Sequence, residues 1–196
     1  MNNYVYKLGN ALYINLTNRC TNRCRFCVRN KCSGVGGYDL WLDREPTPQE
    51  VIDRIDAPSK YNEIVFCGYG EPMVKLDEII AIARVLKEKG ARIRINTNGQ
   101  ANLYHGKNVV PELEGLVDAI SISLNAPTAE KYDQLCHSIY GAEAFDAVLD
   151  FARECVKIIP KVVFTVVDIL PPEDMERCRR IAEQIGAEFR VRGMMR

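Results

Sequence analysis

Strand-like and helix-like segments alternate along most of the chain, and this alternation constrains the fold more than any other feature. Apolar residues recur at helical spacing over residues 76–89, 144–159 and 172–185, with strand-like segments between them. Helices of ten or more residues between strands are typical of parallel crossovers. The strands are expected at residues 12–17, 63–67, 92–97, 119–124, 161–167 and 189–192.

Six strands are too few for the usual eight-stranded barrel. We therefore predict an α/β fold, an open partial (βα)6 barrel with a six-stranded parallel sheet. The chain has 196 residues, 47% of them hydrophobic, which suits a single domain over residues 1–196. A capping box at Thr47–Glu50 predicts a further helix to about residue 56, and a shorter helix is expected over residues 129–136.

Four of the strands carry apolar residues on one side and polar residues on the other. In residues 92–97, for example, Ile93 and Ile95 alternate with Arg94 and Asn96. Helices on both faces would require both sides to be apolar, so we expect one face to line a polar hollow that binds a ligand. Candidates for gripping a carboxylate or phosphate there, or alternatively ordinary surface charges, are Arg92, Arg94, Arg190 and Arg192.

The charge balance and the apolar segments argue against several classes of partner. Lys and Arg number 26, as do Asp and Glu, so neither a nucleic-acid groove nor a membrane-surface patch is predicted. The longest apolar stretch, residues 162–167, is too short to span a bilayer. The first ten residues lack the apolar core of a signal peptide, so we expect a soluble, cytoplasmic protein.

Three cysteines, Cys20, Cys24 and Cys27, crowd into eight residues directly after the first expected strand. Thiolates on such a loop can hold a [4Fe–4S] cluster, and three ligands leave one iron open, as in catalytic metal sites. Cys32 raises two alternatives. It could complete a zinc site, or it could close the cluster for simple electron transfer.

The cysteine spacing, with Phe26 before Cys27, resembles the radical S-adenosylmethionine (SAM) superfamily. Two further segments strengthen the resemblance. Gly68-Tyr-Gly-Glu-Pro72 looks like the GGEP motif of that superfamily, and Thr97-Asn-Gly99 ends the third strand as in many members. Ser121-Ile-Ser-Leu-Asn125 likewise ends the fourth. More narrowly, the chain resembles the small group of TatD-associated radical SAM proteins.

This resemblance implies a [4Fe–4S] cluster on Cys20, Cys24 and Cys27, with SAM as the second cofactor. SAM would be cleaved reductively to a 5′-deoxyadenosyl radical, which takes hydrogen from an unidentified substrate. The sequence names no catalytic residue. The residues implied in SAM binding are Phe26 at the adenine, the main chain of Gly68, Tyr69, Gly70 and Glu71 at the ammonium, and Asn96, Ser123 and Asn125 at the ribose or methionine part.

Tyr69 departs from the usual motif by separating the two glycines, which leaves open which carbonyl meets the ammonium. The resemblance also implies a reductant such as flavodoxin or ferredoxin. The compact chain favours a peptide or protein as substrate. The alternative function is a non-catalytic iron–sulfur electron carrier or redox sensor, which would have no use for the Gly68–Pro72 segment.

Overall fold

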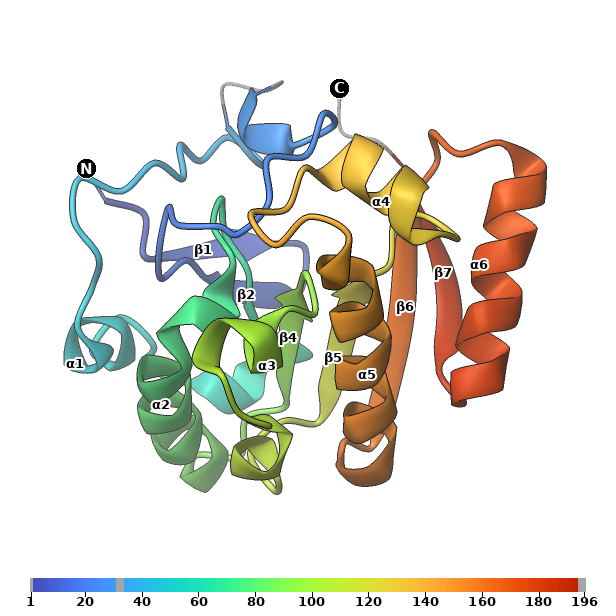
Figure 1. Ribbon diagram of the computed structural model, residues 1–196. Helices are drawn as coiled ribbons and strands as arrows, with labels where there is room; N and C mark the ends of the chain where they lie inside the picture. The colour runs from blue at the N-terminus through green and yellow to red at the C-terminus, as the bar shows by residue number, and fades with distance from the viewer. Residues whose placement is uncertain (1, 31–33, 194–196) are drawn as a thin grey trace.

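The computed structural model describes residues 2–30 and 34–193. These residues form a seven-stranded sheet whose strands lie side by side in chain order (Figure 1). The first two strands are antiparallel and every later pair is parallel. The strands are β1 (Val5–Leu8), β2 (Ala11–Ile14), β3 (Glu63–Phe66), β4 (Ile93–Thr97), β5 (Ala119–Ser123), β6 (Lys161–Val167) and β7 (Glu188–Arg192).

The predicted count of six strands is wrong because β1 was not expected. All six predicted strands are present as β2–β7, and β1 adds an antiparallel edge strand. Leu8 pairs with Ala11 across a two-residue turn, and Gly9 has a φ of 58°, which a glycine adopts without strain. The sequence does contain a signal for this hairpin. The Gly9-Asn10 pair lies between two short apolar segments and is a typical two-residue hairpin turn.

The helices connect the parallel strands. α4 and α6 have the predicted bounds, whereas α1 keeps the predicted Thr47 capping box but ends at Ile52 rather than near residue 56. The short α3 was not predicted. The helices are α1 (Pro48–Ile52), α2 (Leu76–Glu88), α3 (Ala101–His105), α4 (Ala129–Cys136), α5 (Glu143–Ile158) and α6 (Pro172–Ile185).

Helices α2, α3, α5 and α6 lie on one face of the sheet, with α2 beside the early strands and α6 beside β7 (Figure 1). The main core lies between these two layers. Ile95, Ile122, Phe151 and Phe164 are fully buried there. Each such side chain contributes about 1.5–3 kcal/mol by leaving water, so this layer contact supplies the main driving force for folding.

The opposite face, here called the inner face, carries the predicted polar parity but is less open than predicted. Arg94, Asn96 and Ser123 are half-buried on β4 and β5. Near β1 and β2, by contrast, residues 34–42 cover the sheet. Val35 and Leu40 of this segment form a second apolar cluster with Tyr6 and Tyr69. The accessible polar surface is therefore shifted away from the β1 edge.

None of the helices in the described ranges is both long enough and apolar enough to cross a membrane.

Candidate functional site

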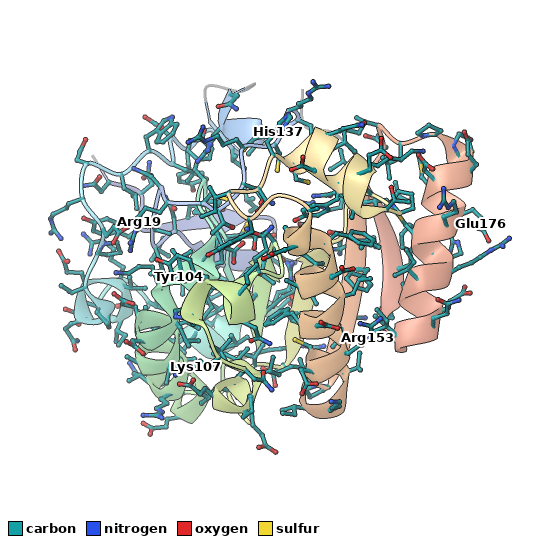
Figure 2. The ribbon with its side chains drawn as sticks, viewed as in Figure 1. Arg19, Tyr104, Lys107, His137, Arg153 and Glu176 are labelled. Carbon is teal, nitrogen blue, oxygen red and sulfur yellow. The ribbon has the colours of Figure 1, made fainter. Side chains whose placement is uncertain are left out.

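The cysteine loop, residues 18–30, follows β2 and is held by main-chain hydrogen bonds on two sides. The Glu71 N–H donates to the Arg19 carbonyl at 2.8 Å, which joins the loop to the end of β3. The Arg23 N–H donates to the Cys136 carbonyl at 2.9 Å, which joins it to the end of α4. His137, the next residue after α4, lies at the upper edge of the molecule in Figure 2.

A buried side-chain network centred on Gln100 also holds the cysteine loop. Gln100 is 1% exposed, and all of its polar atoms are used. Its Oε1 accepts hydrogen bonds from the hydroxyls of Thr21 at 2.7 Å and Ser138 at 3.0 Å. Its Nε2 donates to Asn22 Oδ1 at 2.8 Å and to the Tyr132 hydroxyl at 2.9 Å. Sequence reasoning missed Gln100, which the Thr97-Asn-Gly99 motif immediately precedes.

The three predicted cluster ligands lie half-buried on this loop. Burial raises the pKa of Cys20 to about 12, and the Asn22 N–H donates to its sulfur at 3.4 Å. Burial likewise raises the pKa of Cys27. The pKa of Cys24 is also raised, first by a hydrogen bond with the thiol of Cys136 and then by burial. Burial in the loop therefore keeps these three thiols neutral, and they would have to lose their protons to bind a metal.

The structure does not bring these three thiols together as a metal site. Within the described residues, no three His, Cys, Asp or Glu side chains converge on a position that could hold a metal ion. The thiol of Cys24 lies beside that of Cys136, which contributes to its raised pKa. Cys136 was read from the sequence as a helix end, and it does end α4, so only the tertiary structure reveals its contact with the loop. Cys32, the alternative fourth ligand, lies outside the described residues.

The two glycines of the Gly68–Pro72 segment are required by the protein's own packing. A Cβ on Gly70 would lie 2.3 Å from the Thr17 carbonyl oxygen and 2.5 Å from that of Arg19. A Cβ on Gly68 would lie 2.0 Å from Asn15 Oδ1. The main chain here is partly exposed, whereas Tyr69 between the glycines is buried with its ring edge-on to Trp41 at 5.3 Å. The Tyr69 side chain thus packs inside the protein and leaves the main-chain groups of Gly68 and Gly70 accessible.

Glu71 uses its carboxylate to connect β3 with β4. It accepts hydrogen bonds from the Thr97 hydroxyl at 2.7 Å, the Asn98 N–H at 2.6 Å and the Met73 N–H at 3.0 Å. Burial raises the pKa of Glu71 to about 7, and these three donors offset part of that rise. The side chain is fully engaged, so only its main chain is accessible to a ligand.

The remaining predicted SAM contacts lie at the carboxyl ends of β4 and β5 and in the cysteine loop. Asn96 and Ser123 are half-buried, and Phe26 packs against the edge of the main core. Asn125 is buried and has a positive φ of 56°, and its amide NH2 donates to Cys136 Sγ at 3.7 Å. Its Oδ1 is buried without a hydrogen-bond partner among the described residues. An unpaired buried acceptor is costly, so this atom suits a ligand that donates to it.

The sheet curves enough for its last strand to influence its third. The charge of Arg192 on β7 acts on the Cys67 thiol at the end of β3, and Arg190 acts on Glu63 at the start of β3. Three strands separate β3 from β7 in the sheet, so these effects reach across the inner face. Such curvature is the arrangement expected of a partial barrel.

The profile of the radical SAM superfamily matches residues 14–185 of the chain, the segment that contains both the cysteine loop and the Gly68–Pro72 segment. The chain belongs to the radical SAM superfamily. The narrower resemblance to TatD-associated proteins stays a prediction.

Two curated relatives are similar in sequence. The probable GTP 3′,8-cyclase of Thermococcus kodakarensis is 29% identical over 153 residues, which cover 77% of this chain and 45% of the relative. The tungsten-containing aldehyde ferredoxin oxidoreductase cofactor-modifying protein of Pyrococcus furiosus is 29% identical over 137 residues, covering 68% and 36%. The chain thus matches less than half the length of these relatives.

Among solved structures, SuiB of Streptococcus suis bound to S-adenosylmethionine superposes with a TM-score of 0.73 at 15% identity. The match covers 96% of this chain and 41% of SuiB. SuiB bound to its precursor peptide SuiA gives a TM-score of 0.72. At this identity the likeness shows the fold alone, and it supports the partial-barrel architecture.

Replacing Gln100 with Leu should loosen the cysteine loop. The change removes one hydrogen-bond partner from each of Thr21, Asn22, Tyr132 and Ser138 at a buried position, and each group left unsatisfied costs about 1–3 kcal/mol. We expect urea unfolding to show a loss of at least that size. Gln134→Leu, on the exposed side of α4, should change stability by about 0.5 kcal/mol or less. Equal losses in the two variants would contradict the role of the network.

Replacing Gly70 with Ala should force the Gly68–Pro72 segment and the cysteine loop apart. The new methyl group would meet two main-chain oxygens that have no free space to move into, so we expect a loss of about 1–3 kcal/mol in thermal or urea unfolding. Gly193→Ala is the control, because its Cβ would meet nothing closer than 3.9 Å. A Gly70→Ala variant as stable as the control would show that the loops are not tightly packed.

Glu71 should make stability depend on pH. Because its pKa is raised from 4.5 to about 7 by folding, the folded state binds more protons than the unfolded state between these values. Stability is therefore expected to fall as pH rises from 4.5 to 7, and this contribution should level off above 7. Urea unfolding of Glu71→Gln should lack this slope, whereas Glu114→Gln at an exposed position should retain it. A slope unchanged in Glu71→Gln would refute the assignment.

Proposed function

We propose that this protein cleaves SAM reductively and directs the resulting 5′-deoxyadenosyl radical at a substrate. When bound, a reduced [4Fe–4S] cluster together with SAM supplies that radical. The observation that carries the proposal is the packing of the cysteine loop directly against the Gly68–Pro72 segment, at the end of the sheet where β4 and β5 present Asn96, Ser123 and Asn125.

In this proposal Cys20, Cys24 and Cys27 are the protein ligands of the cluster. Three features of the chain fit that assignment. The three thiols share one loop, the loop is held by a fully satisfied polar network, and Cys20 already accepts a hydrogen bond from the Asn22 N–H. The loss of the thiol protons on metal binding would convert the buried sulfurs into the thiolates that iron requires.

The same proposal assigns the SAM contacts to partly exposed groups nearby. Main-chain groups of Gly68–Glu71 would receive the ammonium, because Tyr69 and the Glu71 carboxylate are turned into the protein. Phe26 would flank the adenine. Asn96, Ser123 and Asn125 would contact the ribose or methionine part, and the unpaired Oδ1 of Asn125 supports a polar ligand there.

One observation favours the alternative electron carrier. The thiol of Cys136 lies beside Cys24, so a fourth sulfur is within reach of the cysteine loop and could close a cluster. A closed cluster would explain neither the accessible main chain of Gly68 and Gly70 nor the unpaired Asn125 Oδ1. We therefore favour the open cluster and the catalytic function.

For the partners, we propose a flavodoxin or ferredoxin as reductant and a peptide or protein as substrate. The peptide proposal draws on SuiB, whose fold this chain shares and which has been solved with a precursor peptide bound. It also fits an inner face on which Asn96 and Ser123 are only half-buried and which no second layer of helices covers in Figure 1.

The Cys24→Ala variant tests the function. After anaerobic reconstitution with iron and sulfide and reduction with dithionite, the wild type should form 5′-deoxyadenosine from SAM, and Cys24→Ala should form essentially none. Cys155→Ala, buried within α5 away from the loop, is the matched control and should retain product formation. A fully loaded wild type that forms no 5′-deoxyadenosine, together with loss of the cluster in Cys136→Ala, would favour the electron carrier.

A further inference from the structure

β7 places two arginines on the inner face. Phe189 points to the helix side, where the Arg179 guanidinium lies 4.9 Å from its ring centre. Since side chains alternate along a strand, Arg190 and Arg192 extend to the opposite side. The Arg192 guanidinium reaches over β6, its Nη2 lying 3.4 Å from Ser123 Oγ on β5.

The inner face holds more positive charge than its carboxylates neutralise. Arg94 is fully engaged: its guanidinium forms a two-pronged ion pair with Glu63 at 2.8 and 2.9 Å and also donates to Asn96. Arg190 and Arg192 form no ion pair within 4.0 Å of a carboxylate of the described residues. Two guanidiniums thus face the same surface without a carboxylate at ion-pair distance in the part of the chain that the structure describes.

The position of Arg192 is next to the proposed reaction centre. Its charge acts on the thiols of Cys67, beside Gly68, and Cys24 of the cysteine loop. Burial lowers the pKa of Arg192, and the charges of Arg190 and Arg94 act in the same direction. The side chain of Arg192 is nonetheless exposed at the end of β7, so an anion can reach its guanidinium and form charge-assisted hydrogen bonds with it.

We propose that Arg192, assisted by Arg190, binds an anionic group of the substrate, either a carboxylate or a phosphate. This inference rests on the proposed function, because only that function makes the bound anion part of a substrate. The planar fork of a guanidinium matches both anions. Arg94 takes no part in anion binding, because its guanidinium already forms hydrogen bonds with both carboxylate oxygens of Glu63. The anion would fix the substrate above the carboxyl ends of β4 and β5.

The first test measures anion binding directly, with no need for catalysis. Protein labelled with ¹⁵N-arginine is titrated with inorganic phosphate in one arm and acetate in the other, and the side-chain Nε–H signals are followed by NMR. We expect saturable shifts of the Arg192 and Arg190 signals in at least one arm, and the arm that saturates identifies phosphate or carboxylate as the preferred group. A uniform drift of all arginine signals would mean an adventitious ion only and would overturn the proposal.

Substitutions then locate the site. Arg192→Gln should weaken binding of the preferred probe by about 10- to 100-fold, the loss of a charge-assisted hydrogen bond. Arg192→Lys, which keeps the charge without the fork, and Arg190→Gln should each weaken it less. The control is Arg153→Gln, an ion-paired arginine on the outward side of α5 (Figure 2), which should bind as the wild type does. Equal affinity in Arg192→Gln and Arg153→Gln would overturn the proposal.

A competition experiment separates the substrate from SAM, which carries its own carboxylate. Calorimetry of the probe with the cluster-loaded wild type should give the same dissociation constant with and without saturating SAM. Displacement by SAM would assign the guanidinium to SAM and overturn the proposal. Failure of the proposed function would appear separately, as absence of 5′-deoxyadenosine, since the anion titrations require no SAM cleavage.

Discussion

The contact between the Gly68–Pro72 segment and the cysteine loop is the constraint on which the site depends. Gly70 lies so close to the carbonyl oxygens of Thr17 and Arg19 that no side chain fits, and the Glu71 N–H bonds the Arg19 carbonyl at 2.8 Å. Two loops that are far apart in the sequence are thereby held as one surface. Because packed main-chain atoms cannot shift without breaking hydrogen bonds, the position of the cysteines follows from the position of β3.

The apolar core and the polar network have different roles. The core between the sheet and helices α2, α3, α5 and α6 drives folding but is non-directional. The network around Gln100 is directional and fully satisfied, so it selects one arrangement of the cysteine loop. Glu71 adds a third element, a buried carboxyl that connects the ends of β3 and β4. A binding site for a large cofactor requires this kind of order in its loops.

Sequence reasoning succeeded where periodicity or local chemistry decides the structure. α4 and α6 have the predicted ends because Thr128 caps the first and Pro172 and Gly186 bound the second. It failed where long-range contacts decide. The open inner face was overpredicted, because the parity of Tyr13 and Asn15 does not reveal that residues 34–42 fold over them. The hairpin at Gly9 was missed although its turn residues are visible in the sequence. The single-domain organisation and the roles of the site residues stay predictions.

The sequence by itself determined the α/β class, the parallel strands β2–β7 and the family, because these follow from hydrophobic periodicity and from short motifs with a physical requirement at each position. Only the tertiary structure decided which polar groups meet. It placed Cys136 beside Cys24, gave Gln100 its four partners, paired Arg94 with Glu63 and brought Arg192 to Ser123 without an ion pair among the described residues. Those outcomes depend on the curvature of the sheet and on loop packing, which arise from the sum of many distant contacts rather than from any local pattern.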